Sequence, residues 1–159
     1  MFKRAVVPLD GSVVAETIIP FILAIAGPLD LDVRLVRVIA PIPQRTLQDP
    51  RPEVVENLET LRTDAEEYLA AVAAEFRSRG ARFKTEVRLG DPAREIVAAA
   101  QAADADMIAM TTHGRSGLRR VLFGSVAEAV LREAKIPVFL LRQTEADVAR
   151  RAAERRHGA

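Results

Sequence analysis

Five short apolar segments, separated by longer helical patterns, are the feature that most constrains the fold of this chain. The apolar segments have the length and composition of buried strands, and they cover residues 2–8, 31–38, 81–88, 107–111 and 137–142. Helical patterns cover residues 13–26, 53–79 and 125–134, and a further helix is predicted to begin at Asp91 and Pro92. Strands that alternate with helices build a parallel sheet with helices on both faces. We therefore predict a single α/β domain, a Rossmann-like sandwich around a five-stranded parallel sheet of strand order 3-2-1-4-5.

Prolines and glycines set several boundaries within this pattern. Pro20 lies inside the helix predicted over residues 13–26 and should kink it or disturb one turn. Residues 39–52 contain four prolines and are predicted to form an irregular loop. Gly80 is the expected C-cap of the helix over residues 53–79. The polar, Ala- and Arg-rich tail at residues 143–159 is expected to be helical or disordered.

Composition excludes several classes of function. The chain of 159 residues has no cysteine, which excludes disulfides, thiol catalysis and thiolate metal sites. Its two histidines, His113 and His157, cannot build a multi-histidine metal site alone. A net charge of +1 provides no global attraction to nucleic acid, and no apolar run has transmembrane length. Because residues 1–12 lack a signal-peptide pattern, we expect a cytoplasmic protein that binds neither nucleic acid nor a membrane.

The predicted topology brings two loops to one crevice. In open α/β sheets, ligands bind beyond the carboxyl ends of the strands, where the strand order reverses. Here that position lies between strands 1 and 4, which are followed by the loops at residues 10–12 and 112–123. The second loop belongs to the segment TTHGRSGLRRVLFGS, residues 111–125, which leads into the helix that begins near Ser125. Unpaired backbone N–H groups and the helix dipole favour an anion there, so a phosphate-bearing ligand is predicted.

Several familiar motifs are absent from the sequence. No lysine follows any glycine, so there is no Walker A loop, and the dinucleotide motif GxGxxG does not occur. Residues 114–117, GRSG, lack the residue that a GxSxG nucleophile elbow requires between serine and the second glycine. The sequence therefore assigns no catalytic residue.

The polar residues of the two loops each allow two interpretations. Ser125 with Glu128 forms a capping box, which stabilises the helix with or without a ligand. Asp10 either closes a local turn with its neighbours or accepts hydrogen bonds from ribose hydroxyls. Arg115, like Arg119 and Arg120, either neutralises phosphates or lies on a solvated loop surface. His113 either donates to a phosphate or is structural.

The chain resembles the universal stress protein family over about residues 2–142. The resemblance is carried by VVPLDGS at residues 6–12, LVRVIAP at 35–41, the segment from RLGDPAREIV to MTTHG at 88–114, and GLRRVLFGSVAEAVLREAKIPVFLLR at 117–142. It implies a universal stress protein domain at residues 1–142, followed by the tail at residues 143–159.

Nucleotide-binding members of that family carry the pattern G-x2-G-x9-G-[S/T]. Gly114, Gly124 and Ser125 match this pattern, but Thr111 stands where the first glycine would be. The resemblance implies ATP, with adenine near Val38 and Met110, ribose near Asp10 and phosphates at the glycine-rich loop and helix start. The candidate binding residues are Asp10, Ser12, Val38, Met110, Thr111, His113, Gly114, Arg115, Gly124, Ser125 and Val126.

Thr111 leaves two functions open. Its β-branched side chain adds bulk that glycine lacks, whereas its hydroxyl offers the ligand a polar contact. The first function is an ATP-binding stress-response and signalling dimer, with Mg²⁺ accompanying the nucleotide. The alternative is a nucleotide-free dimeric stress-signalling or interaction module.

The resemblance also implies an assembly and bears on catalysis. Members of the family commonly dimerise through the last strand, and the strand at residues 137–142 would present an apolar edge, so we expect a homodimer. No clear general base or metal-ligand cluster is visible, so at most slow ATP hydrolysis is expected. Asp10 is the single carboxylate that we would place near a bound metal ion.

Overall fold

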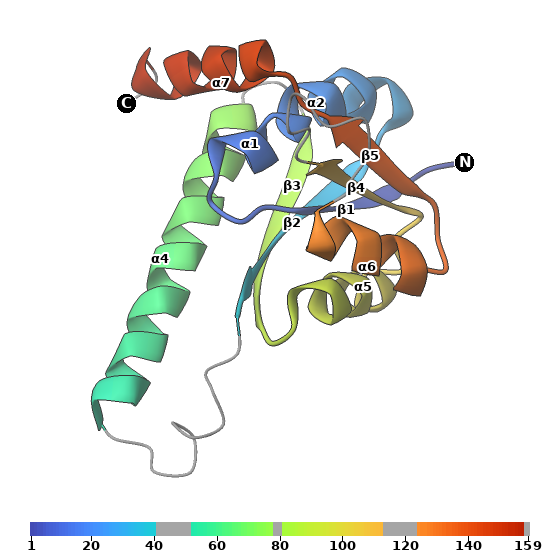
Figure 1. Ribbon diagram of the computed structural model, residues 1–159. Coiled ribbons are helices and arrows are strands. Elements are labelled where there is room, and N and C mark those ends of the chain that lie inside the picture. The colour runs from blue at the N-terminus through green and yellow to red at the C-terminus, as the bar shows by residue number, and fades with distance from the viewer. Residues whose placement is uncertain (41–51, 78–80, 113–123, 158–159) are drawn as a thin grey trace.

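The computed structural model describes residues 1–40, 52–77, 81–112 and 124–157, and its centre is a five-stranded parallel sheet (Figure 1). The strands are β1 (Arg4–Pro8), β2 (Asp32–Ile39), β3 (Arg82–Leu89), β4 (Met107–Thr112) and β5 (Val138–Arg142). Their order is β3-β2-β1-β4-β5, which confirms the predicted order. The central strand β1 pairs with β2 on one side and with β4 on the other.

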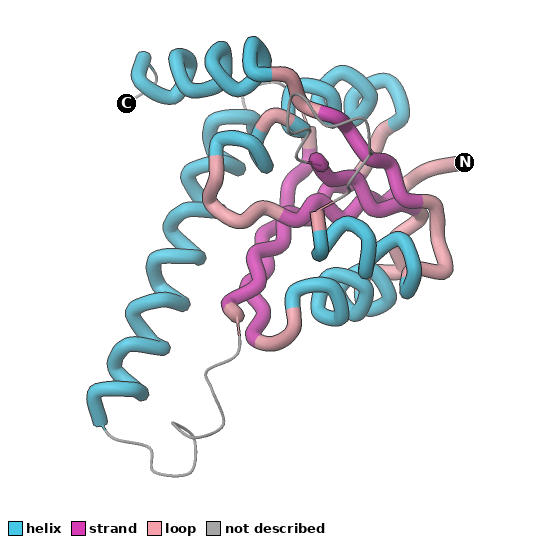
Figure 2. The backbone as a smooth tube through the Cα atoms, viewed as in Figure 1, coloured by secondary structure: helices cyan, strands magenta, loops and turns pink. Residues whose placement is uncertain are grey.

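Helices cover both faces of the sheet, as predicted (Figure 2). Successive strand residues point to opposite faces, so Val6 and Val7 belong to two separate cores. Val7 lies in the core under α2 (Ile18–Leu29) and α4 (Pro52–Arg77), together with Ile19 and Leu69. Val6 lies in the core under α5 (Pro92–Ala102) and α6 (Ser125–Glu133). The chain thus forms the expected three-layered α/β domain.

The first predicted helix is two helices, α1 (Val13–Glu16) and α2, which meet at Thr17. The predicted disturbance by Pro20 is therefore a break of the helix at Thr17, within one turn before the proline, and not a kink at Pro20 itself. A proline cannot donate to the carbonyl four residues earlier and its ring clashes with that group, which here belongs to Glu16. Ending α1 at Glu16 removes both problems. The helix α2 also runs past the predicted end at residue 26 and closes at Asp30, which adopts a left-handed conformation with φ of 50°.

The apolar spacing over residues 53–79 predicts one buried stripe that includes Leu61, Leu69 and Val72, and α4 follows this pattern only in its second half. Leu69 and Val72 are buried against the sheet, as expected. Leu61 was expected in the same buried stripe, but it is 44% exposed because this end of α4 extends past the strands (Figure 1). The predicted C-cap, Gly80, lies outside the described residues.

The polar tail is helical. It forms α7 (Glu145–His157), which lies against α1 (Figure 1). Within the described ranges, no helix combines the length and apolar composition needed to cross a membrane.

The carboxylate of Asp106 ties the start of β4 to the start of β1. Its Oδ2 accepts hydrogen bonds from the backbone N–H groups of Lys3 and Arg4, each at 2.7 Å. These bonds favour the ionised form and lower the pKa of Asp106. Because the folded pKa lies below the unfolded value of about 3.9, the stabilisation is present above that value. It is lost as the pH falls through the folded pKa.

Asp106→Asn is therefore expected to flatten the acid dependence of stability. The urea midpoint would be measured from about pH 5 down to pH 2, the range in which carboxylates protonate. Asp104→Asn is the matched control, because Asp104 is exposed and makes only a 3.5 Å pair with Arg4. If the urea midpoint falls equally steeply with decreasing pH in both variants, this role of Asp106 is contradicted.

Candidate functional site

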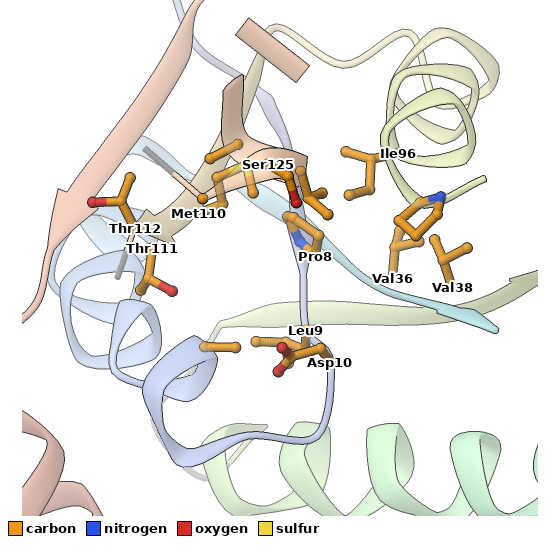
Figure 3. Close-up of a pocket in the computed structure, with 15 residues that line it drawn as sticks. Pro8, Leu9, Asp10, Val36, Val38, Ile96, Met110, Thr111, Thr112 and Ser125 are labelled. Atoms are coloured by element: carbon orange, nitrogen blue, oxygen red, sulfur yellow. The ribbon is translucent and has the colours of Figure 1, made fainter. Parts of the chain in front are cut away.

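A pocket of about 330 Å³ opens at the carboxyl ends of β1 and β4 (Figure 3). This is the predicted position, because β1 and β4 are neighbours where the strand order reverses. The ends of β1, β2 and β4 form its walls, and the N-terminal turns of α5 and α6 close it. It is lined by Pro8, Leu9, Asp10, Ala15, Val36, Val38, Pro92, Ile96, Met110, Thr111, Thr112, Gly124, Ser125, Val126 and Ala127.

One part of the pocket is an apolar slot. Val36 and Val38 lie two residues apart on β2, so their side chains point to the same face of the sheet, toward α5. Ile96 of α5 and Met110 of β4 lie across from them (Figure 3). A slot lined by β-branched side chains and a methionine suits a flat, weakly polar ring.

The start of α6 forms the polar end of the pocket. The N-cap is Gly124, in an extended conformation with φ of −57° and ψ of 150°, and Ser125 is the first helical residue. The predicted cap at Ser125 is therefore wrong by one residue, and the glycine at the cap position has no side chain with which to cap the helix. The first intrahelical bond runs from Glu128 N–H to the Gly124 carbonyl at 2.9 Å. The N–H groups of the first turn thus have no cap side chain as acceptor, which favours an anion beside them.

Asp10 and Ser12 form the tight turn that follows β1. The Oδ1 of Asp10 accepts the backbone N–H of Ser12 at 2.9 Å, which is the local turn anticipated from the sequence. Asp10 also lines the pocket, and its Oδ2 has no hydrogen-bond partner among the described residues. One carboxylate thus closes the turn and presents an oxygen to the pocket. Ser12 lies outside the lining, and its Oγ instead caps α1 by accepting Ala15 N–H at 3.1 Å.

The glycine of this turn holds a conformation that other residues rarely adopt. Gly11 has φ of +87°, and a Cβ there would lie 3.3 Å from Nη2 of Arg37. Gly11→Ala is therefore expected to cost about 1–2 kcal/mol of folding free energy. Gly27→Ala is the comparison, since Gly27 is helical and a Cβ there meets no atom within 4 Å apart from its chain neighbours and the backbone of its own helix. The gain of about 0.5–1 kcal/mol for alanine over glycine in a helix is partly offset by Pro28, whose ring disfavours a Cβ on the helical residue before it, so only a small change is expected. Urea denaturation measures both, and equal effects of the two substitutions would refute the strain at Gly11.

The structure brings most of the predicted residues together. Seven of them line the pocket, namely Asp10, Val38, Met110, Thr111, Gly124, Ser125 and Val126. Three others, His113, Gly114 and Arg115, lie outside the described residues, as do Arg119 and Arg120. Thr111 is half-buried at the end of β4 and takes part in the lining, so its bulk bears directly on the space for a ligand.

Sequence reasoning missed part of the lining, which includes Val36, Pro92, Ile96 and Thr112. Val36 could have been predicted from the sequence, because it lies two residues before Val38 and therefore on the same face of β2. Pro92 could have been predicted as well, since it opens the helix that follows β3. Ile96 lies on α5, and the side of α5 that meets the pocket depends on how this helix packs on the sheet.

No group of three or more His, Asp or Glu side chains that could hold a metal ion occurs among the described residues. Asp10 is the single carboxylate in the lining of the pocket. The described part of the pocket thus combines an apolar slot, one carboxylate and the start of a helix.

Known proteins resemble this chain along most of its length. A model of the universal stress protein family matches residues 1–142. The chain is 34% identical over 144 residues to Universal stress protein MJ0531 of Methanocaldococcus jannaschii, which covers 90% of this chain and 84% of that protein. Among solved structures it is similar to MJ0577 of the same organism, with a TM-score of 0.77 and 27% identity over 91% of this chain and 99% of that chain. The universal stress protein from Archaeoglobus fulgidus in complex with dAMP has the same fold, with a TM-score of 0.62 and 24% identity over 88% of this chain and 97% of that one.

Proposed function

The chain belongs to the universal stress protein family, and we propose that it binds an adenine nucleotide, ATP in the first place, in the pocket between β1 and β4. The observation that carries the proposal is the combination of groups that line this one pocket. An apolar slot, a carboxylate at a strand end and a helix start capped by a glycine are the kinds of groups that a base, a ribose and phosphates require.

Each part of the nucleotide has a matching set of residues. Adenine enters the slot between Val38 and Met110, where its ring faces are removed from water. The ribose hydroxyls donate to the Oδ2 of Asp10. The phosphates accept hydrogen bonds from the backbone of Gly124, Ser125 and Val126.

The loop that precedes α6 completes the phosphate site in this proposal. Gly114 is the second glycine of the family pattern, and His113 and Arg115 are its neighbours in the loop. His113 would donate to a phosphate, and Arg115 would supply the positive charge that the described lining lacks. Mg²⁺ would arrive with the nucleotide, held chiefly by its phosphates, with Asp10 as the nearest protein carboxylate. No general base is assigned, so hydrolysis is at most slow.

The volume of the pocket and the ligand of a protein with the same fold support the proposal. A volume of about 330 Å³ lies within the range of about 300–1,000 Å³ typical of ligand pockets. The Archaeoglobus fulgidus protein in complex with dAMP has this fold, which agrees with an adenine nucleotide as the ligand.

The proposal also includes the assembly of the protein and its role in the cell. The outer strand β5 carries the half-buried residues Val138 to Leu141 at the edge of the sheet, an apolar edge that a second copy would cover. We expect a cytoplasmic homodimer that signals in the stress response through the occupancy of its pocket. Sedimentation equilibrium at micromolar concentration is expected to give twice the monomer mass, and a monomer would exclude this assembly.

Two measurements test the binding. Heat-denatured, freshly purified protein is expected to release an adenine nucleotide, and ATP added to the stripped protein is expected to bind in a calorimetric titration. Thr111→Gly provides the comparison, because it restores the first glycine of the family pattern. If the parent binds no ATP and Thr111→Gly does, the threonine blocks the pocket and the chain is a nucleotide-free module. If neither binds, the pocket has another ligand.

A further inference from the structure

The C-terminal helix α7 is joined to the body of the domain by a buried ion pair. Arg151 is only 3% exposed, and its Nη2 and Nε lie 3.0 and 3.1 Å from Oε2 of Glu16, which is fully buried. The same guanidinium donates to both carboxylate oxygens of Glu75 on α4, at 2.6 and 2.9 Å. One side chain of α7 thus connects α1 with α4.

The network continues from Glu16 toward the turn after β1. The other oxygen of Glu16 accepts the Tyr68 hydroxyl at 2.8 Å. The guanidinium of Arg37 lies over the Tyr68 ring, 4.9 Å from its centre. A Cβ built on Gly11, the residue that follows Asp10, would lie 3.3 Å from the guanidinium of Arg37, so Arg37 stands beside this glycine. A chain of contacts through Glu16, Tyr68 and Arg37 therefore leads from α7 toward the turn beside the pocket.

The charge states of the network are held by its own contacts. Hydrogen bonds to Glu75 raise the pKa of Arg151, so the guanidinium stays charged. Burial and the adjacent Glu16 raise the pKa of Tyr68, so its hydroxyl remains a proton donor to the carboxylate. Both groups keep these roles throughout the neutral pH range.

The helix α1 needs such support. It has only four residues, Val13 to Glu16, and an isolated helix of this length is unstable in water. Ala15 of α1 lines the pocket, and Ser12, which caps α1, also donates the hydrogen bond that orients Asp10. Any shift of Glu16 is therefore passed along one helical turn to the Asp10 carboxylate.

We propose that Arg151 and Glu16 are positioning residues of the nucleotide pocket, through which the C-terminal helix holds Asp10 in place for the ribose. The inference about ribose rests on the proposed nucleotide binding. The helix α7 lies beyond residues 1–142, which the family model matches.

The test uses the full chain with Glu16→Gln and Arg151→Met combined, which removes both buried charges together and avoids leaving one unpaired. The control is Arg150→Ala, a neighbouring residue of α7 whose guanidinium pairs with Asp147 on the exposed side of the helix. In the ligand-free proteins, amide hydrogen exchange of residues 11–17 is expected to be roughly tenfold faster in the double variant and unchanged in the control. If the double variant does not fold, Arg151→Lys replaces it, because it keeps the charge and loses the bidentate contacts.

The second readout is discrimination between ATP and 2′-deoxy-ATP by titration calorimetry. The parent is expected to prefer ATP by roughly tenfold, since a hydrogen bond to a charged group is lost with the 2′-hydroxyl. In the double variant this ratio is expected to fall to near one. Unchanged exchange at residues 11–17 overturns the inference, and so does faster exchange with an unchanged ratio. If the parent binds no nucleotide, the proposed function fails, whereas the exchange data still decide whether α7 holds the turn.

Discussion

Replacing Ser125 with glutamate is expected to weaken ATP binding by roughly 100-fold or more. The new carboxylate would stand at the first residue of α6, next to the proposed phosphates. Two like charges about 4 Å apart repel by about 4 kcal/mol at the effective dielectric of a protein surface. Because Ser125 is exposed, the expected repulsion energy is somewhat smaller than this value. Each loss of about 1.4 kcal/mol in binding free energy lowers the affinity tenfold.

The same substitution is not expected to destabilise the protein. A negative charge in the first turn of a helix is favourable by about 0.3–1 kcal/mol, so thermal stability should stay level or rise slightly. Ser125→Gln is the control, because it has the size of glutamate without its charge. Titration calorimetry with ATP compares the three proteins. Equal affinities of the glutamate variant and the parent would place the phosphates elsewhere, and equal losses in both variants would point to steric exclusion.

Arg151→Met alone is expected to lower the free energy of unfolding by about 3–5 kcal/mol. The substitution leaves the carboxylate of Glu16 buried, with the Tyr68 hydroxyl at 2.8 Å and the half-exposed Arg155 at 3.4 Å. Arg155 compensates this buried charge only in part, and the remaining penalty exceeds that of the lost packing. Arg150→Ala, on the exposed side of α7, should change stability by no more than about 0.5 kcal/mol.

Urea denaturation distinguishes the two variants by their midpoints at an unchanged slope. Adding Glu16→Gln to Arg151→Met should recover a large part of the loss, because both charges are then absent. If Arg151→Met costs no more than Arg150→Ala, α7 is not held by the buried pair. A double variant less stable than Arg151→Met would show that the cost lies in packing rather than in charge.

The position of the pocket was predictable from the sequence. Strand order and the Gly124-Ser125 pattern both pointed to the space between β1 and β4, and the structure brings Asp10, Met110 and Ser125 together there. The exact cap of α6 was not predictable. Serine is a good N-cap, and only the extended backbone of Gly124 places the cap one residue earlier, so that Ser125 is the first helical residue.

The division of the first helix has a similar explanation. Pro20 signals a disturbance in the helix, but the disturbance can be absorbed by a kink or by a break one turn earlier. The break at Thr17 frees Glu16 to end a short helix and face α7, which requires knowing where α7 packs.

The sequence by itself determined the α/β class, the strand order and the family, because apolar periodicity and local motifs are properties of neighbouring residues. Only the tertiary structure decided that the polar tail is a docked helix and that Arg151 pairs with Glu16, 135 positions earlier in the chain. A charged residue in a polar segment is usually solvated, and its composition does not distinguish it from its neighbours. Its burial depends on which turn of α7 meets α1 and α4, and that meeting exists only once the sheet has brought distant segments together.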